Sequence, residues 1–548
     1  LMHFNAMPEA PFHLARVLLA DDDALPETIR AMSGLILKNL IKQNESIPPG
    51  LLKFMVDLDL WDVLMMSRSP MVKSSISSLL STIILVSQGG VFQEDGEDLV
   101  GWLCTPLGIG TVERMLEDGA VQLVHGHPEQ IDRIAGFLIK YINDDRTDDE
   151  LEGEWQGNLK RAVTALCHVL PLFEPEHFNL PSLLTGFGKI GHMPVVQRSV
   201  CQCLNVLAQN FPTELGPSLP AALQYTFSIF SQQLSTSKDD AAAQEATEFW
   251  LGLVELDQLG PFLSQQDVFI KDQLIPVLLS NMRYAPNAPE ILESTSDDQD
   301  RDEDIAPRHH RQAKERDLSV GPEEGEVGED GSDEAEYEWT LRKSSAATLD
   351  ALSGCLEISR VFLPSLLPHI ERLFSSESWL DVEVAVLAVG AVAEGSRHGM
   401  EAYLPALLPH LVGLLKCEQS HPLVKTITAW ALGRYVQWIS EQEPFGSQVM
   451  EALLYSMLST CKPVQRASCS ALTRFVESAP NLTDRVMPAI LTCLKPALLT
   501  YPKRSLLLAY DLIRSLADEL PEALSTALQA NPSILYILLE KFKALHFE

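Results

Sequence analysis

The chain has 548 residues, of which 46% are hydrophobic and 21% charged, and its formal net charge is −34 at pH 7. This length exceeds one ordinary globular domain, so it predicts either several domains or an array of repeats. Strong acidity excludes duplex nucleic acid as an expected direct ligand, because phosphate binding needs clustered Lys and Arg; it favours basic partners or simply serves solubility.

The nine cysteines contain no Cys-x-x-Cys pair and lie mostly within apolar helical patterns. That distribution is typical of buried thiols in a reducing compartment. The most apolar runs, such as the ten residues from Ser78, are too short to span a bilayer, so we expect no membrane insertion. No signal peptide is visible, and we expect both ends to be incomplete because the chain begins at Leu1 and stops at Glu548 within an apolar pattern.

From the amino-terminal end, residues 9–60 contain two amphipathic segments whose apolar residues recur at helical spacing, before Pro48 and Pro49 break the pattern. The same pattern recurs along the chain: a helix of about 15 residues, a break at Pro, Asp, Gly or Asn, and a second helix. The sequence therefore predicts paired helices.

The segment from Asp297 to Glu338 interrupts this pattern. It holds 17 acidic residues against five basic ones and lacks the spaced Leu, Ile and Phe that a core-forming helix needs. We expect a long disordered acidic loop here, which is either functional or a linker. The predicted organisation is helical repeats over 1–296, the loop over 297–338, and helical repeats over 339–548.

After the acidic segment the repeat can be measured. Five helical segments align on anchor positions that lie 41, 42, 40 and 40 residues apart, namely Leu341, Val382, Val424, Val464 and Arg504. A period of about 40 to 47 residues built from helix pairs is typical of HEAT or armadillo repeats. We therefore predict an all-α HEAT-repeat solenoid, with a helical bundle of coincidental spacing as the alternative. In such a solenoid the second helices line the concave face, where we expect a ligand.

No catalytic signature is present, neither a phosphate-binding GxxxxGK[ST] loop nor GxSxG nor HExxH, so we expect no enzyme activity and no cofactor. His125 and His127, like His309 and His310, lack Cys or carboxylate companions at ligand spacing. We therefore predict no metal site.

The second helices carry polar and aromatic residues beside small ones. An aromatic ring next to alanines can hold an apolar side chain of a peptide, and carboxylates on successive helices can hold its Arg or Lys. Taken singly, a Trp at helical spacing is more often core, and an exposed Asp is usually only solvated. Their repetition on one face favours peptide binding; the residues are Asp350, Trp430, Arg434, Glu477, Asp511 and Asp518, with Ala346, Ala347 and Ala429 among them.

The run TLRKSSAATLDALS after the acidic segment, followed by AVGAVAEG, YLPALLPHL, ITAWALGRYVQW, PVQRASCSAL and LLLAYDLIRSLAD, resembles the transportin (karyopherin-β2) family of importin-β-type nuclear import receptors. The resemblance is closest over 338–518 and weak over 89–181. It implies a non-enzymatic, monomeric receptor that shuttles between cytoplasm and nucleus. The implied partners are Ran-GTP, nucleoporins and cargo proteins, RNA-binding proteins among them, that carry basic nuclear localisation signals ending in Pro-Tyr.

The resemblance also implies roles for particular segments. Residues 1–296 would bind Ran-GTP, and residues 339–548, expected to be truncated, would bind cargo on the concave face. The acidic loop, with Trp339 as its groove contact, would displace cargo when Ran-GTP binds. Glu477 would pair with the basic residue before Pro-Tyr, and Asp511 with a more distant basic patch. The Pro-Tyr end would contact Ala346, Ala347, Asp350, Leu387, Ile427, Trp430 and Arg434.

One residue departs from the family pattern. Arg474 stands where the family usually has a small polar residue, one turn before Glu477. A cation there is expected to weaken the attraction of Glu477 for a basic cargo residue. The alternative function is a HEAT scaffold subunit of an enzyme complex, of the phosphatase regulatory type, for which a long acidic loop would not be expected.

Overall fold

The computed structural model describes residues 7–545 except 21–23, 68, 91–95, 145–151, 175–178, 233–239, 286, 287, 289, 290, 292, 293, 295–338 and 443. Within these described residues the regular structure is helical, and no strand occurs. The predicted all-α fold is confirmed. The acidic segment 297–338, with His309 and His310, lies outside the described residues.

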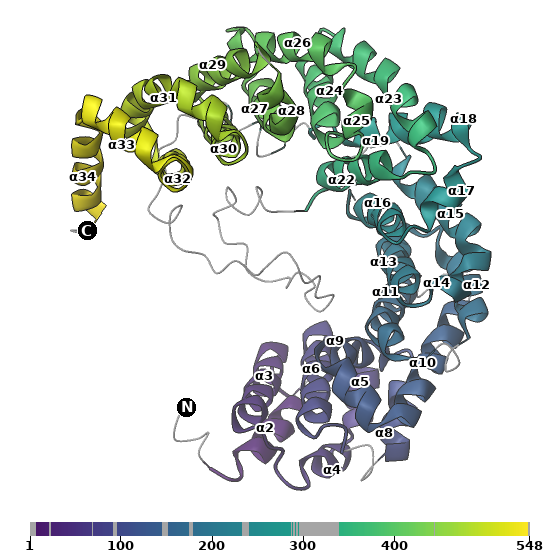
Figure 1. Ribbon diagram of the computed structural model, residues 1–548. Coiled ribbons are helices and arrows are strands. Elements are labelled where there is room, and N and C mark those ends of the chain that lie inside the picture. Colours follow the sequence, from purple (N-terminus) through teal and green to yellow (C-terminus); the bar gives the residue numbers. More distant parts are fainter. Residues whose placement is uncertain are drawn as a thin grey trace. The chain divides into compact units, whose positions relative to one another are not determined.

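The chain forms two compact units, of which the first reaches Ile229 and the second begins at Phe230. In the first unit α3 packs on α6, α6 on α9, α9 on α11 and α11 on α13, so one layer of helices continues from repeat to repeat (Figure 1). Its helices are α2 (Ala10–Leu18), α3 (Glu27–Asn44), α4 (Leu51–Val56), α5 (Leu60–Met66), α6 (Pro70–Val86), α8 (Gly96–Leu103), α9 (Ile109–Gly126), α10 (Pro128–Asn143), α11 (Glu152–Val169), η2 (Leu170–Leu172), α12 (Leu180–Ile190), α13 (Pro194–Asn210), α14 (Pro212–Leu215), η4 (Gly216–Ser218) and α15 (Leu219–Phe230).

The second unit contains the helices on both sides of the acidic segment. Helix α22, which follows that segment, packs against α16 and α19, which precede it. Its helices are α16 (Asp240–Glu255), α17 (Leu259–Leu263), α18 (Asp267–Phe269), η5 (Ile270–Leu274), α19 (Ile275–Asn281), α22 (Leu341–Gly354), α23 (Ser359–Phe374), α24 (Trp379–Ala391), α25 (Arg397–Met400), α26 (Leu404–Lys416), α27 (Pro422–Arg434), α28 (Val436–Glu441), α29 (Phe445–Met457), α30 (Lys462–Ser478), α31 (Pro480–Thr500), α32 (Lys503–Glu519), α33 (Pro521–Ala530) and α34 (Ser533–Leu545).

The 40-residue period corresponds to a physical stack. The five aligned anchors fall in α22, α24, α27, α30 and α32, and each of these helices packs on the next. We call this row the second-helix layer. Between them in the sequence lie α23, α26, α29 and α31; of these, α26 packs on α29 and α29 on α31, on the other side of the unit (Figure 1). This pairing confirms the predicted HEAT architecture, in which neighbouring repeats bury the apolar faces that one helix pair would expose.

Helix α24 lies within the second-helix layer, between α22 and α27. Nearly every residue of its sequence WLDVEVAVLAVGA is apolar, and the run from Glu383 to Ala391 is buried without interruption. A helix that is hydrophobic on all sides is stable only when neighbours cover all of its faces. Here α22, α23 and α27 provide that cover.

Candidate functional site

All cargo-contact residues predicted from the sequence lie in the second-helix layer. Helix α22 carries Ala346, Ala347 and Asp350; α24 carries Leu387; α27 carries Ile427, Trp430 and Arg434; α30 carries Glu477; and α32 carries Asp511. The two acids of α30 and α32 are exposed, and most of the others are half-buried. Leu387 is only 7% exposed, so it offers a ligand little surface.

Arg434 links three helices of this layer. Its Nη2 lies 3.1 Å from a carboxylate oxygen of Asp350 in α22 and 3.1 Å from one of Glu394, just beyond α24. Its Nε donates to the carbonyl oxygen of Gly390 at 3.3 Å. Charge-assisted bonds of a guanidinium to carboxylates are stronger than neutral ones, and a cation is favoured in the last turn of a helix. Arg434 is therefore held in one place before any ligand arrives.

Trp430 lies one turn before Arg434 and packs closely on α24. A Cβ added at Gly390 would lie 2.3 Å from Cζ3 of the Trp430 ring, so only glycine leaves room for the indole there. The guanidinium carbon of Arg434 stands 5.8 Å from the ring centroid, within cation–π distance. The ring remains partly exposed. It is consequently a fixed aromatic surface that can hold an apolar side chain.

Burial raises the pKa of two side chains around Arg434, namely Asp350 and Tyr435. Burial raises the pKa of Asp350 above its ordinary value, Arg434 lowers it and Glu394 raises it. The neighbouring Tyr435 donates its hydroxyl proton to the carbonyl oxygen of Val389 at 2.7 Å, and burial raises the pKa of that phenol. These contacts fasten the end of α27 to α24.

The acidic residues further along the second-helix layer, Glu477 and Asp511, form no ion pair with the residues that the structure describes. Glu477 of α30 accepts a hydrogen bond from the hydroxyl of Ser515 at 3.1 Å. Asp511 of α32 makes no ion pair among the described residues. Arg474 lies beside Gly433 of α27, where a Cβ added to the glycine would be 3.4 Å from Cδ of Arg474. Both carboxylates are therefore open to a basic ligand.

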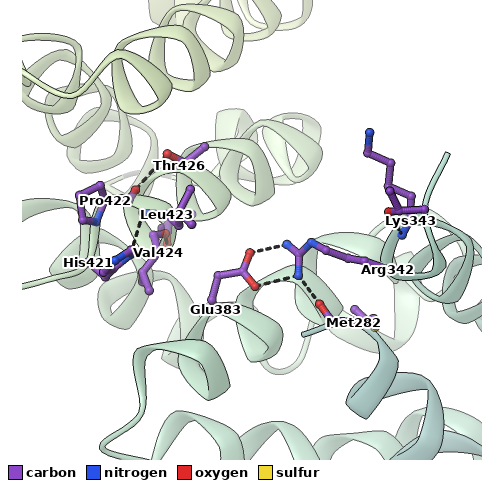
Figure 2. A network of polar contacts seen from close by, with 11 residues as sticks. Met282, Arg342, Lys343, Glu383, His421, Pro422, Leu423, Val424 and Thr426 are labelled. Atoms are coloured by element: carbon purple, nitrogen blue, oxygen red, sulfur yellow. Dashed lines mark hydrogen bonds and ion pairs between the residues drawn. The ribbon is translucent and has the colours of Figure 1, made fainter. Parts of the chain in front are cut away.

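A buried ion pair fixes the start of α22, directly after the acidic segment. Figure 2 shows the guanidinium of Arg342 facing Glu383 of α24, at 2.5 and 2.9 Å, and the carbonyl oxygen of Met282. Glu383 is fully buried, and the Arg342 guanidinium also stacks over the ring of Tyr284 at 3.9 Å. The sequence analysis missed this pair, although Arg342 and Glu383 each follow a repeat anchor directly and carry opposite charges.

Trp339 precedes α22 and is 41% exposed. The hydroxyl oxygen of Thr340 accepts a hydrogen bond from the amide of Lys343 and so caps the helix. The role of Trp339 as a loop contact stays a prediction.

Among the residues that the structure describes, no group of three His, Cys, Asp or Glu is arranged to hold a metal ion. No described helix is both long and apolar enough to cross a membrane.

Residues 383–435 match the HEAT-like repeat family. The chain is 35% identical over 367 residues to importin subunit beta-2 of Schizosaccharomyces pombe, which covers 61% of this chain and 38% of that protein. It is 30% identical over 550 residues to transportin-1 of Mus musculus, with 94% of this chain and 57% of the relative covered. The chain thus spans about half the length of these curated relatives.

Solved structures agree on the fold. The Kap95:Nup1 complex matches 97% of this chain and 59% of the solved chain, with a TM-score of 0.68 and 16% sequence identity. A crystal structure of importin beta matches 96% of this chain and 60% of its own, with a TM-score of 0.67 and 15% identity. The solved structures confirm the predicted fold, and the curated relatives confirm the resemblance that the sequence motifs carry.

Proposed function

We propose that this chain, which belongs to the transportin and importin-β family of HEAT-repeat proteins, is a nuclear transport receptor that binds basic cargo signals ending in Pro-Tyr and releases them when Ran-GTP binds. The proposal rests on one arrangement above all: the fixed Trp430 and Arg434 stand in the same helix layer as the open carboxylates of Glu477 and Asp511. No enzyme activity is part of this function.

The physical chemistry of the layer suits such a peptide. The partly exposed indole of Trp430 can pack against proline and tyrosine rings, while Asp350 and Arg434 present polar groups to a phenol hydroxyl. Exposed Glu477 and Asp511 can then attract the basic residues of the same peptide along successive helices. The net charge of −34 adds a long-range attraction for basic cargo.

The remaining parts of the proposal follow from the family. Residues 1–296 would bind Ran-GTP, residues 339–548 would bind cargo, and the acidic segment 297–338 would compete with cargo for the same surface. A tethered acidic segment has a high effective concentration, of the order of millimolar for short flexible tethers. Nucleoporins would be further partners, and the receptor would shuttle as a monomer between cytoplasm and nucleus.

The first test is to titrate a fluorescent basic Pro-Tyr peptide with the purified chain, with and without Ran-GTP. We expect saturable binding that Ran-GTP reverses, and reversal should fail when residues 297–338 are deleted although both ligands still bind. Binding of neither ligand would refute the receptor function and favour a scaffold subunit. Peptide release by Ran-GTP at the original rate in the deletion variant would refute only the role of the acidic segment.

A second test addresses the peptide surface. Trp430→Ala should weaken peptide binding by about 1 to 3 kcal/mol, the usual cost of removing a central aromatic anchor. Tyr455→Ala is the matched control, because Tyr455 is an exposed aromatic residue of α29, outside the second-helix layer. Equal affinities in the two folded variants would assign Trp430 to packing alone.

A further inference from the structure

A pocket of about 390 Å³ opens beside Trp430's helix, where the carboxyl-terminal ends of α24, α27 and α30 lie close together. Pockets for small ligands begin at roughly this size, about 300 Å³. Its charged lining consists of three arginines and two glutamates, namely Arg397, Arg434, Arg474, Glu394 and Glu401. Arginines thus outnumber glutamates in this lining, although the net charge of the whole chain is −34.

The three arginines of the pocket differ in whether they form ion pairs. Arg434 is held by Asp350 and Glu394, each at 3.1 Å. Arg397 and Arg474 are exposed and make no ion pair with any residue that the structure describes. Two guanidinium groups therefore remain available in the pocket.

The carboxylates leave this imbalance in place. Glu394 shares Arg434 with Asp350, and Glu401 lies 3.3 Å from the ring nitrogen of His398, so neither glutamate is paired with Arg397 or Arg474. Glu477, one turn beyond Arg474, accepts from Ser515 of the next helix and makes no ion pair with Arg474. An incoming anion would therefore meet two arginines, Arg397 and Arg474, that form no ion pair with the residues that the structure describes.

The pocket lies between two parts of the proposed peptide site. Trp430 and Arg434 of α27 would hold the Pro-Tyr end, and Glu477 of α30 would hold the preceding basic residue. Arg434 and Arg474 each lie ten residues after their repeat anchors, so they occupy equivalent positions on adjacent, packed helices. Residues of a peptide that connect the two contacts would pass Arg434 and Arg474, which line the pocket.

We propose that this pocket binds an oxyanion, the carboxylate of an acidic side chain or the phosphate of a phosphorylated one, at a position between the basic residue and the Pro-Tyr end of the cargo signal. The inference rests on the proposed function and narrows its substrate class. Arg474 and Arg397 supply planar forks of donors that match carboxylate and phosphate oxygens in pairs. Arg474, which would repel a basic cargo residue at Glu477, thereby becomes a selectivity residue.

Four fluorescent peptides test this inference. They share the basic patch and the Pro-Tyr end and differ at one intervening position, which is Gln, Glu, Ser or phosphoserine. We expect the Glu peptide to bind about fivefold more tightly than the Gln peptide, the gain of one partly exposed charged hydrogen bond. Phosphoserine should likewise bind more tightly than Ser, and the larger of the two ratios identifies carboxylate or phosphate as the better ligand.

Variants separate the pocket from general electrostatics. In Arg474→Gln both affinity ratios should fall to about one, whereas Arg360→Gln, which removes an exposed arginine of α23, should leave them unchanged. Comparing ratios across variants isolates the pairwise interaction from effects on folding. Raising the salt concentration should shrink the ratios in the unmodified chain.

The outcomes distinguish this inference from the proposed function. If the neutral peptides bind but both ratios are one in the unmodified chain, the pocket does not select anions while the receptor function survives. Ratios that persist unchanged in Arg474→Gln also overturn the inference. If none of the four peptides binds, the proposed function itself fails.

Discussion

Gly390 of α24 offers a direct test of whether the position of Trp430 matters for binding. A Cβ added at this glycine would lie 2.3 Å from Cζ3 and 2.8 Å from Cε3 of the Trp430 ring, and 3.1 Å from Cβ of Ala431. Carbon atoms in contact normally stand about 3.5 to 4.0 Å apart. Gly390→Ala must therefore push the indole by roughly 1 Å or more, or separate α24 from α27.

The expected energies are moderate. Overpacking a helix contact costs about 1 to 3 kcal/mol, and replacing glycine by alanine inside a helix returns roughly 0.5 to 1 kcal/mol. The free energy of unfolding should therefore fall by about 1 to 2 kcal/mol, which leaves the protein folded. Peptide affinity should fall about tenfold, because the displaced ring loses around 1.4 kcal/mol of contact with the ligand.

The assay combines fluorescence anisotropy of the labelled Pro-Tyr peptide with thermal unfolding. Gly413→Ala in α26 is the control, since a Cβ added at Gly413 meets no atom within 4 Å. It should keep the peptide affinity and raise the unfolding temperature slightly. Unchanged affinity in a folded but destabilised Gly390→Ala variant would refute the view that the ring of Trp430 is a fixed peptide contact.

Two further predictions concern stability. Glu383 is fully buried and paired with Arg342, so Glu383→Ala should lower the free energy of unfolding, measured by urea denaturation, by about 3 to 5 kcal/mol. The double variant Glu383→Leu with Arg342→Met should recover most of this loss, because it leaves no unpaired charge buried. A Glu383→Ala variant that is as stable as the double variant would contradict this prediction. Burial lowers the pKa of His421, whose Nδ1 caps α27, so the unfolded chain takes up protons first and thermal stability should fall as the pH drops below about 6.5. His421→Asn replaces the capping nitrogen with a capping oxygen and should flatten that dependence; an identical pH profile in this variant would exclude His421 as the cause.

The repeat architecture could be predicted because burial imposes a period on the sequence. The anchors Leu341, Val424 and Val464 are buried and Val382 is half-buried, because apolar residues must recur wherever one helix stacks on the next. The ion pair of Arg342 and Glu383 could have been found by the same alignment, since both follow an anchor directly. Helix propensity and hydrophobic periodicity do not reveal ion pairs between repeats. Such pairs are found only when the residues at equivalent positions of successive repeats are compared.

Other features could not be predicted from the period. Glu394 lies in the turn after α24 and Arg397 begins the short helix α25, and no helical spacing relates either of them to Arg434. The contact of Arg434 with Asp350 joins residues 84 positions apart, across the intervening helix α24. Leu387 illustrates a different limit: because α24 is apolar on every side, its sequence does not show which face a ligand could reach.

Packing and recognition use the same residues in the second-helix layer. The missing side chain of Gly390 lets α27 approach α24, and the same gap seats the indole of Trp430 with part of its ring exposed. Arg434 then fastens α27 to α24 through Gly390 and to α22 through Asp350, while it also lines the pocket. A change at any of these positions alters both affinity and stability, so a binding role can be assigned only where affinity falls more than a control of equal destabilisation would allow.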